Sequence, residues 1–172
     1  MVEKIISYIL GLFSAFLEVE YGKEILVFII SLLPILELRG GLIAATLLNV
    51  EPVVAYIISI IGNILPVPFI LLFIKKIIDW MGKSKIKFLK KIVNFLHKKV
   101  EKNKDSIEKY GYLGLFLFVG VPLPGTGAWT GCLVAALLDM DRKKSFMCVL
   151  CGILMASVIM MIISYGMIGN LI

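Results

Sequence analysis

The sequence predicts an all-α integral membrane protein, an inverted repeat of interfacial helix, re-entrant helical hairpin and kinked transmembrane helix. Three observations predict this class. The 172 residues are 60% hydrophobic and only 17% charged, whereas soluble domains contain about 25% charged residues. Charge-free apolar runs exceed twenty residues, which is too long for ordinary core helices. The motifs of the first half also recur in the second half. We therefore expect one membrane domain over residues 1–172 and exclude a soluble enzyme or a disulfide-rich secreted protein.

The first repeat is expected over residues 1–79 and contains three elements. Residues 5–17 are apolar but too short to cross a hydrocarbon core of about 30 Å, which indicates an interfacial helix. Residues 25–48 are apolar at both ends and are interrupted by Pro34, two charges and two glycines, which predicts a re-entrant hairpin. Residues 53–78 begin with a charge-free run long enough to span the membrane, and its prolines predict a kink.

A basic linker over residues 80–109 separates the repeats, and the positive-inside rule predicts that it is cytoplasmic. Over residues 86–100, apolar residues recur at helical spacing with lysines between them, which is typical of an amphipathic helix on an anionic lipid surface. The alternative is a helix packed on the protein's own loop. No recognisable nucleic-acid module is present, so nucleic acid is not an expected partner. The second repeat is expected over residues 110–172, with a hairpin at 112–138 and a transmembrane helix at 145–170.

A shift of ninety residues aligns the two halves. The matched pairs are Pro34 with Pro124, Gly41 with Gly131, Asn49 with Asp139, Glu51 with Asp141, and Gly62 with Gly152. The interrupted segments either cross the membrane fully or turn back within it. Full crossings would export the basic turn at residues 139–144, whereas hairpins leave this turn and the linker in the cytoplasm. One crossing per half then inverts the second copy and places both termini outside a plasma membrane. Two spans alone hardly enclose a cavity, which favours a homodimer or a larger assembly.

Glu37 and Arg39 are the only charges within the four apolar runs of the sequence, which are residues 25–48, 53–74, 112–138 and 145–172. An isolated charge at mid-bilayer costs about 2.5–3.5 kcal/mol on insertion scales, so residues kept there are usually functional or paired. Arg39 offers a forked donor set suited to phosphate or carboxylate, and Glu37 is placed to exchange a proton between wet and dry states. The structural alternative is a pair that holds the hairpin tip, which Gly40 and Gly41 would permit.

The second hairpin tip has no charge but is rich in glycine and hydroxyl groups. Thr126 is placed to cap the returning helix, and Gly125 and Gly127 would let backbone N–H groups approach an anion. Gly127 and Gly131 also form a G-x-x-x-G motif, which indicates close helix packing at least as strongly. No catalytic pair, metal cluster or cofactor motif accompanies these residues. Pro124 and Thr130 are further candidates for the site. Trp129 is expected to be either a pocket wall or an interfacial anchor. Asn63 is expected to be either a pocket wall or a partner in a hydrogen bond between helices.

Three motifs carry a family resemblance: E-L-R-G-G at residues 37–41, G-N-x-x-P at 62–66 and P-L-P-G-T-G-A-W-T-G at 122–131. They resemble the putative small multi-drug export protein family, which is similar to the DedA (VTT or SNARE-associated) membrane proteins. The resemblance covers about residues 25–172. It implies two re-entrant hairpins and proton-coupled movement of polyprenyl-phosphate lipid carriers, with Glu37 and Arg39 at the site. The second tip departs from the DedA pattern, because Gly120, Gly127 and Ala128 stand near the positions where those proteins carry arginines.

The sequence therefore favours a secondary transporter with a midplane site between two hairpins. Its expected substrate is an anionic amphiphile such as a polyprenyl-phosphate lipid carrier, moved together with protons. The alternative is an exporter of small cationic drugs, in which Glu37 contacts the substrate. An intramembrane enzyme and a non-transporting scaffold are less favoured, the first because the chain has no catalytic pair or metal motif.

Overall fold

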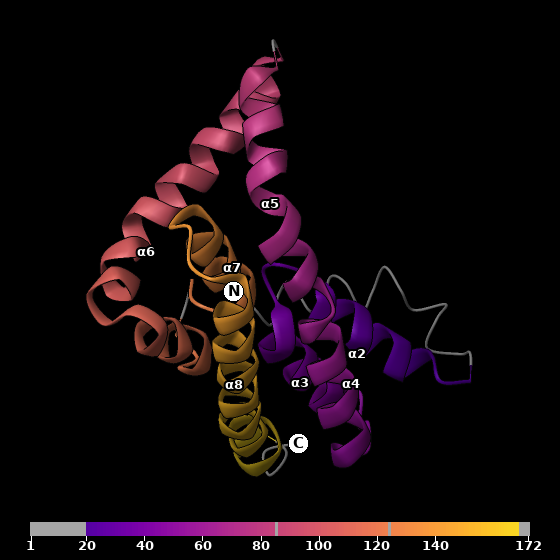
Figure 1. The fold of residues 1–172 in the computed structure, drawn as a ribbon. Helices are drawn as coiled ribbons and strands as arrows, with labels where there is room; N and C mark the ends of the chain where they lie inside the picture. The colour runs from indigo at the N-terminus through magenta and orange to yellow at the C-terminus, as the bar shows by residue number, and fades with distance from the viewer. Residues whose placement is uncertain (1–19, 85, 124, 169–172) are drawn as a thin grey trace. The chain divides into compact units, whose positions relative to one another are not determined.

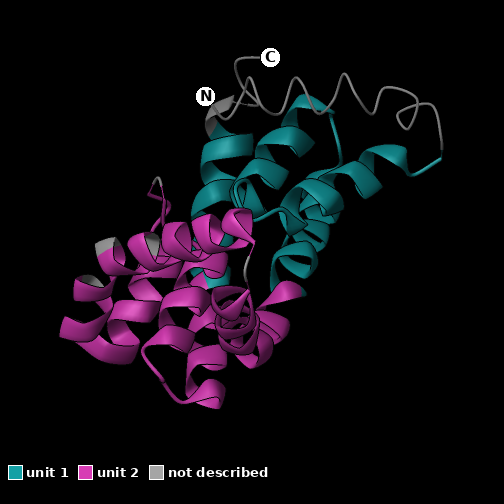
Figure 2. Ribbon diagram, turned by 90° about the horizontal axis from the view of Figure 1, so that it is seen from above, with its two compact units in different colours: residues 1–65, 153–172 teal, residues 66–152 magenta. Residues whose placement is uncertain are grey.

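The computed structural model describes residues 20–84, 86–123 and 125–168 (Figure 1). All regular structure in these residues is helical, which confirms the predicted all-α class for the described part of the chain. Two helical stretches, Pro52–Lys83 and Arg142–Gly166, are long and apolar enough to cross a membrane. The predicted interfacial helix at 5–17 lies outside the described residues, and so does Pro124. The chain divides into two compact units, residues 1–65 with 153–172 and residues 66–152 (Figure 2).

Unit 1 contains the first interrupted segment and the helix that follows it. Its helices α2, α3 and α4 pack against one another, and their bounds are Gly22–Leu32, Glu37–Leu47 and Pro52–Ile64. The turn that contains Pro34 separates α2 from α3, because proline cannot donate the backbone hydrogen bond that would continue the helix. At 1.5 Å per residue, each 11-residue arm is about 16 Å long, which is about half of a hydrocarbon core.

Helix α4 has a well-defined start, since Pro52 occupies its first turn and the Glu51 carboxylate accepts a 2.8 Å hydrogen bond from the Val54 amide. The end of α8 (Arg142–Met161) and the π-helical turns Ile162–Ile168 complete unit 1. The core of this unit is made of small and branched apolar side chains from α2, α3, α4 and α8: Val27, Leu38, Leu42, Ala45, Ala55, Ala156 and Met160.

Unit 2 is built from α5 (Pro66–Lys83), α6 (Lys87–Gly120), α7 (Ala128–Leu137) and the beginning of α8. Helix α5 packs against α6 and α7, and α6 packs against α7. A non-helical residue, Gly111 (φ 57°, ψ −129°), divides α6 into a long basic part and a short apolar part. The short part, residues 112–120, and α7 are the two arms of the second interrupted segment.

The long basic part of α6 is longer than the amphipathic helix predicted over residues 86–100. Helix α6 begins at Lys87 and continues well past residue 100, and Val93, Val100 and Ile107 are buried inside unit 2. These apolar side chains therefore contact the protein itself, and the predicted contact of residues 86–100 with an anionic lipid surface stays a prediction. Phe88 and Phe95 are 69% and 63% exposed, so the predicted contact with an anionic lipid surface would use these aromatic side chains rather than the valines.

The ninety-residue repeat reappears in the local geometry of the backbone. Asn49 and Asp139 both have φ of 53°, a left-handed conformation that Asn and Asp tolerate. The amide that follows each of them donates to the carbonyl of Ala45 or Ala135 at 2.9 and 3.0 Å. Asp141 caps α8 as Glu51 caps α4, by accepting a 2.9 Å hydrogen bond from the amide three residues later. The two copies thus share turn and cap geometry, and the inversion of one relative to the other stays a prediction.

Candidate functional site

Glu37 is the most unusual residue of the first hairpin. Its side chain is only 5% exposed, and its φ of 52° lies in the left-handed region. The other non-glycine residues with positive φ in the described part of the chain are Tyr21, Asn49 and Asp139, and all three are exposed. Glutamate adopts this conformation far less readily than asparagine or aspartate, and the conformation costs about 1–2 kcal/mol. Burial of a carboxylate on a strained backbone marks this position as a candidate functional site.

Arg39 is half-buried on the first turn of α3, close enough to Glu37 for their charges to attract. On a regular helix, side chains two residues apart point in nearly opposite directions. The left-handed backbone at Glu37 changes this geometry at the start of the helix. The structure therefore places the two predicted charges close together at the start of α3, and a direct pair between them stays a prediction.

Gly40 and Gly41 allow close packing behind this pair. A Cβ atom at Gly41 would lie 1.8 Å from the Ser31 Oγ atom on α2 and 3.1 Å from the Ser59 Oγ atom on α4. Only glycine permits this approach, because real Cβ contacts under 3.0 Å essentially never occur. A Cβ at Gly40 would in turn meet the Leu36 Cβ atom at 2.6 Å. The glycines that follow Arg39 thus fix the packing of α3 against its neighbours, in addition to any contact with a ligand.

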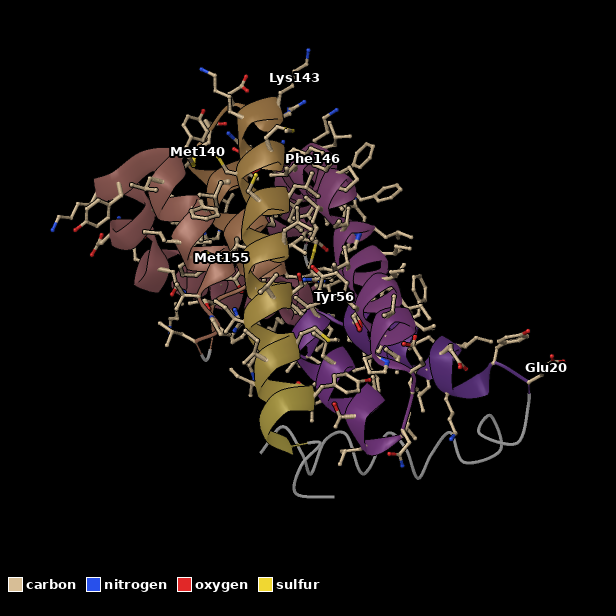
Figure 3. All side chains as sticks on the ribbon, turned by 90° about the horizontal axis from the view of Figure 1, so that it is seen from below. Glu20, Tyr56, Met140, Lys143, Phe146 and Met155 are labelled. Carbon is tan, nitrogen blue, oxygen red and sulfur yellow. The ribbon has the colours of Figure 1, made fainter. Side chains whose placement is uncertain are left out.

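Helix α4 presents polar groups to the interior of unit 1. Ser59 and Asn63 are one helical turn apart, and their side chains are 0% and 2% exposed. The Ser59 hydroxyl and the Asn63 amide oxygen have no hydrogen-bond partner among the described residues. Buried polar atoms normally have partners, so these two are suited to a water molecule or a substrate group. Tyr56 lies on the same helix (Figure 3). By contrast, its hydroxyl is hydrogen-bonded to the Ser157 hydroxyl at 3.0 Å.

The second hairpin tip is closed by its own hydrogen bonds. The Thr126 hydroxyl lies 2.8 Å from the Leu123 carbonyl oxygen and 3.1 Å from the Val121 carbonyl oxygen. Gly127 occupies the N-cap position of α7, and the predicted role of Thr126 as the cap of the returning helix stays a prediction. Gly127 has φ 135° and ψ −178°, a conformation essentially confined to glycine. This backbone requirement is sufficient to explain Gly127.

The remaining candidates of the second tip lie around the start of α7. Gly125 is in the turn with φ of 87°, Thr130 is buried on α7, and Trp129 beside it is half-buried. A Cβ atom at Gly131 would lie 2.7 Å from the Val119 side chain on the opposite arm, so this end of the G-x-x-x-G motif serves helix packing. The two sets of predicted site residues lie in different units, and a shared midplane site stays a prediction.

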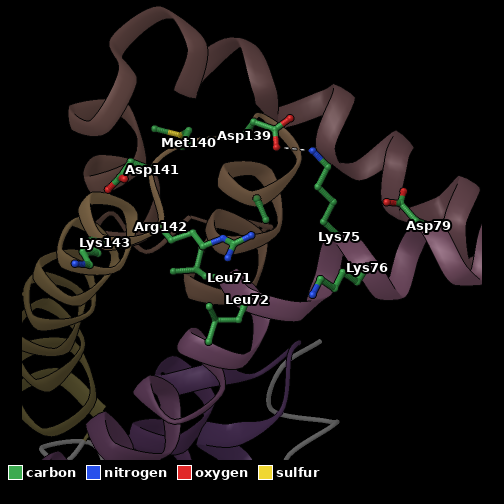
Figure 4. A pocket seen from close by; sticks show the side chains of 11 residues that line it. Leu71, Leu72, Lys75, Lys76, Asp79, Asp139, Met140, Asp141, Arg142 and Lys143 are labelled. Atoms are coloured by element: carbon green, nitrogen blue, oxygen red, sulfur yellow. Dashed lines mark hydrogen bonds and ion pairs between the residues drawn. The ribbon is translucent and has the colours of Figure 1, made fainter.

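A charged groove in unit 2 was missed by sequence reasoning. It has a volume of about 750 Å³, and Lys75 of α5 pairs across it with Asp139 of the α7–α8 turn (Figure 4). Arg142 and Lys76 extend toward the same space. Lys75 and Lys76 are more than sixty positions from Asp139 and Arg142 in the sequence, and only packing brings the two sets together. The sequence feature that could have indicated the groove is that both sets of residues lie at the polar ends of apolar segments, and both ends were expected on the cytoplasmic side.

Comparison with known proteins gives one match. A family model described as putative small multi-drug export protein matches residues 37–159, which is more than half of the chain. The match begins at Glu37, directly after the turn that contains Pro34, and includes the second hairpin tip. No curated protein and no solved structure matches the chain.

Proposed function

Because the chain belongs to the putative small multi-drug export protein family, we propose that it is a membrane secondary transporter in which Glu37 carries the coupling proton. The buried carboxylate of Glu37 is the observation that carries this proposal. A carboxylate in an apolar site favours its neutral form, and water or a cation favours its charged form. A group that alternates between these surroundings takes up and releases a proton at each cycle.

Arg39 keeps the charge of this site balanced. When Glu37 is ionised, the two side chains are neutral together, which lowers the cost of placing either charge within the membrane. When Glu37 is protonated, the guanidinium has no full counter-charge and is suited to bind an anion. Proton uptake and binding of an anionic amphiphile, such as a polyprenyl-phosphate lipid carrier, would therefore accompany one another.

The family description, putative small multi-drug export protein, supports a different substrate class, drugs, for which we propose small cations. In this second candidate function, the ionised Glu37 binds the substrate directly and releases it when a proton arrives. Arg39→Gln separates the two functions. The substitution is expected to abolish transport of an anion, because it removes the binding group, and to spare transport of a cation.

Re-entrant insertion of both broken segments is part of the proposal. Each of the four arms has about ten residues, which is about 15 Å, or half of the hydrocarbon thickness. The Lys75–Asp139 ion pair also supports it, since the end of the first spanning helix and the turn after α7 must then lie on one side. With full crossings, these two residues would lie on opposite faces of the membrane.

The experiment is transport by the full chain in proteoliposomes, with and without a pH gradient. A polyprenyl phosphate and a lipophilic small cation serve as the two substrates. Glu37→Gln preserves size and hydrogen bonding but cannot titrate, so we expect the dependence on the pH gradient to be lost. Glu108→Gln, at an exposed position on α6, is the matched control and should retain it. Full gradient dependence in the Glu37→Gln protein would reject the coupling role.

A further inference from the structure

We propose that unit 2 binds an anionic membrane phospholipid in the charged groove between α5 and the start of α8. This site is separate from Glu37 and does not depend on the proposed transport function. The groove is lined by basic residues from two elements, Lys75 and Lys76 on α5, and Arg142 and Lys143 on α8. Its volume of about 750 Å³ is within the usual range of ligand pockets.

The charges of the groove are unevenly paired. Lys75 is paired with Asp139, and the Asp141 carboxylate is occupied as the cap of α8. The only acidic group left is Asp79, one turn beyond Lys76 on α5. The groove's other three basic residues, Lys76, Arg142 and Lys143, form no ion pair in the described part of the chain. The groove therefore has cationic groups available for a phosphate, which Arg binds by two parallel hydrogen bonds and Lys as a point charge.

An apolar groove of about 470 Å³ continues from the charged one, because both are lined by Leu71, Leu72, Arg142 and Lys143. Its other lining residues are Pro68, Phe146 and Met147. Leu72 and Met147 are 45% and 56% exposed. A free phosphate ion would use only the charged part of this surface. A phospholipid would use both, with its headgroup among the cations and an acyl chain along the apolar side chains.

The position of the groove along α5 and α8 also fits a phospholipid. On α5, the sequence changes from apolar to charged at Lys75, and on α8 it changes from charged to apolar after Lys144. The groove lies at both transitions, where helices that cross a membrane meet the headgroup layer. Basic side chains at this level attract anionic lipids, and their methylene stems remain on apolar surface.

Native mass spectrometry of the detergent-solubilised full chain tests the site by titration with phosphatidylglycerol, phosphatidylcholine or inorganic phosphate. We expect tighter binding of phosphatidylglycerol than of the neutral lipid. Arg142→Gln and Lys76→Gln should each weaken it about five- to tenfold, because each removes a charge-assisted contact. Lys144→Gln is the matched control, since Lys144 is on the same turn of α8 but does not line either part of the groove. A normal thermal unfolding midpoint would establish that each variant is folded.

Two further measurements distinguish a phospholipid from free inorganic phosphate as the ligand of the groove. Met147→Ser should weaken binding of phosphatidylglycerol about two- to fivefold and leave binding of inorganic phosphate unchanged, since only the lipid has an acyl chain. Equal binding of both lipids would overturn the proposal. Binding of inorganic phosphate as tight as binding of phosphatidylglycerol would also overturn it. Equal losses of phosphatidylglycerol affinity in the Lys144→Gln and Arg142→Gln variants would do the same. None of these outcomes depends on transport, so the site and the transport function can fail separately.

Discussion

Replacement of Gly41 by alanine tests the packing of the first hairpin. The new Cβ atom would lie 1.8 Å from the Ser31 Oγ atom, so α3 or Ser31 must move. Overpacking of this kind costs about 1–3 kcal/mol, and the higher helix propensity of alanine offsets up to about 1 kcal/mol. We therefore expect a net loss of about 1–2 kcal/mol in the free energy of unfolding. For a chain of this size, this lowers the unfolding midpoint by about 2–8 °C.

The assay is thermal unfolding of the purified protein in detergent, with Gly82→Ala as the control. No atom lies within 4 Å of a Cβ at Gly82, so this variant should be neutral or slightly stabilised by its helix propensity. Removing the Ser31 hydroxyl as well should recover most of the loss, because the nearest atom at position 31 is then the Cβ at 3.1 Å. Equal midpoints for Gly41→Ala and Gly82→Ala, or no recovery in the Ser31→Ala double variant, would refute the reasoning.

Three smaller changes test other contacts by the same thermal assay. Gly152→Ala should lower the midpoint by several degrees, because its Cβ would lie 2.8 Å from the Val119 Cβ atom. Tyr165→Phe removes a 2.9 Å hydrogen bond to the loop after α3 and should cost about 1 kcal/mol, or about 2–4 °C. Asp139→Asn breaks the pair with Lys75, but both side chains are largely exposed, so a loss of less than about 1 kcal/mol is expected. An effect of several kcal/mol at Asp139 would contradict this assignment.

The sequence predicted the positions of the helix interruptions because their signals are local. Pro34 removes a backbone donor from the first tip, and the turns at Asn49 and Asp139 use residue types that tolerate positive φ. Gly111 lies between the predicted linker at residues 80–109 and the predicted hairpin at residues 112–138, although the sequence did not identify it as the residue at which α6 breaks. A lone glycine inside a helical run is often tolerated, so its non-helical conformation became evident only from the backbone angles.

Contacts between residues far apart in the sequence could not be predicted from the sequence. Lys75 and Asp139 form their pair only because α5 packs against α7, and periodicity within either segment carries no information about that packing. The apolar stripe of α6 was ambiguous for the same reason, since burial of Val93 against protein and burial in lipid require the same spacing. For the candidate site, the sequence identified Glu37 and Arg39 by their charge, but not the left-handed backbone that places Glu37.

The central claim is that the broken segments turn back within the membrane, and the orientation of the turn after α7 tests it most directly. Single cysteines at Lys91 and Lys144, both exposed, would be introduced into a chain whose three native cysteines are replaced by alanine. They would be labelled in oriented vesicles with a membrane-impermeant thiol reagent. Re-entrant hairpins predict that both positions react from the same face, and that a cysteine at Asn49 reacts from the opposite face. Reaction of positions 91 and 144 from opposite faces would show that the second segment crosses the membrane fully and would contradict the account.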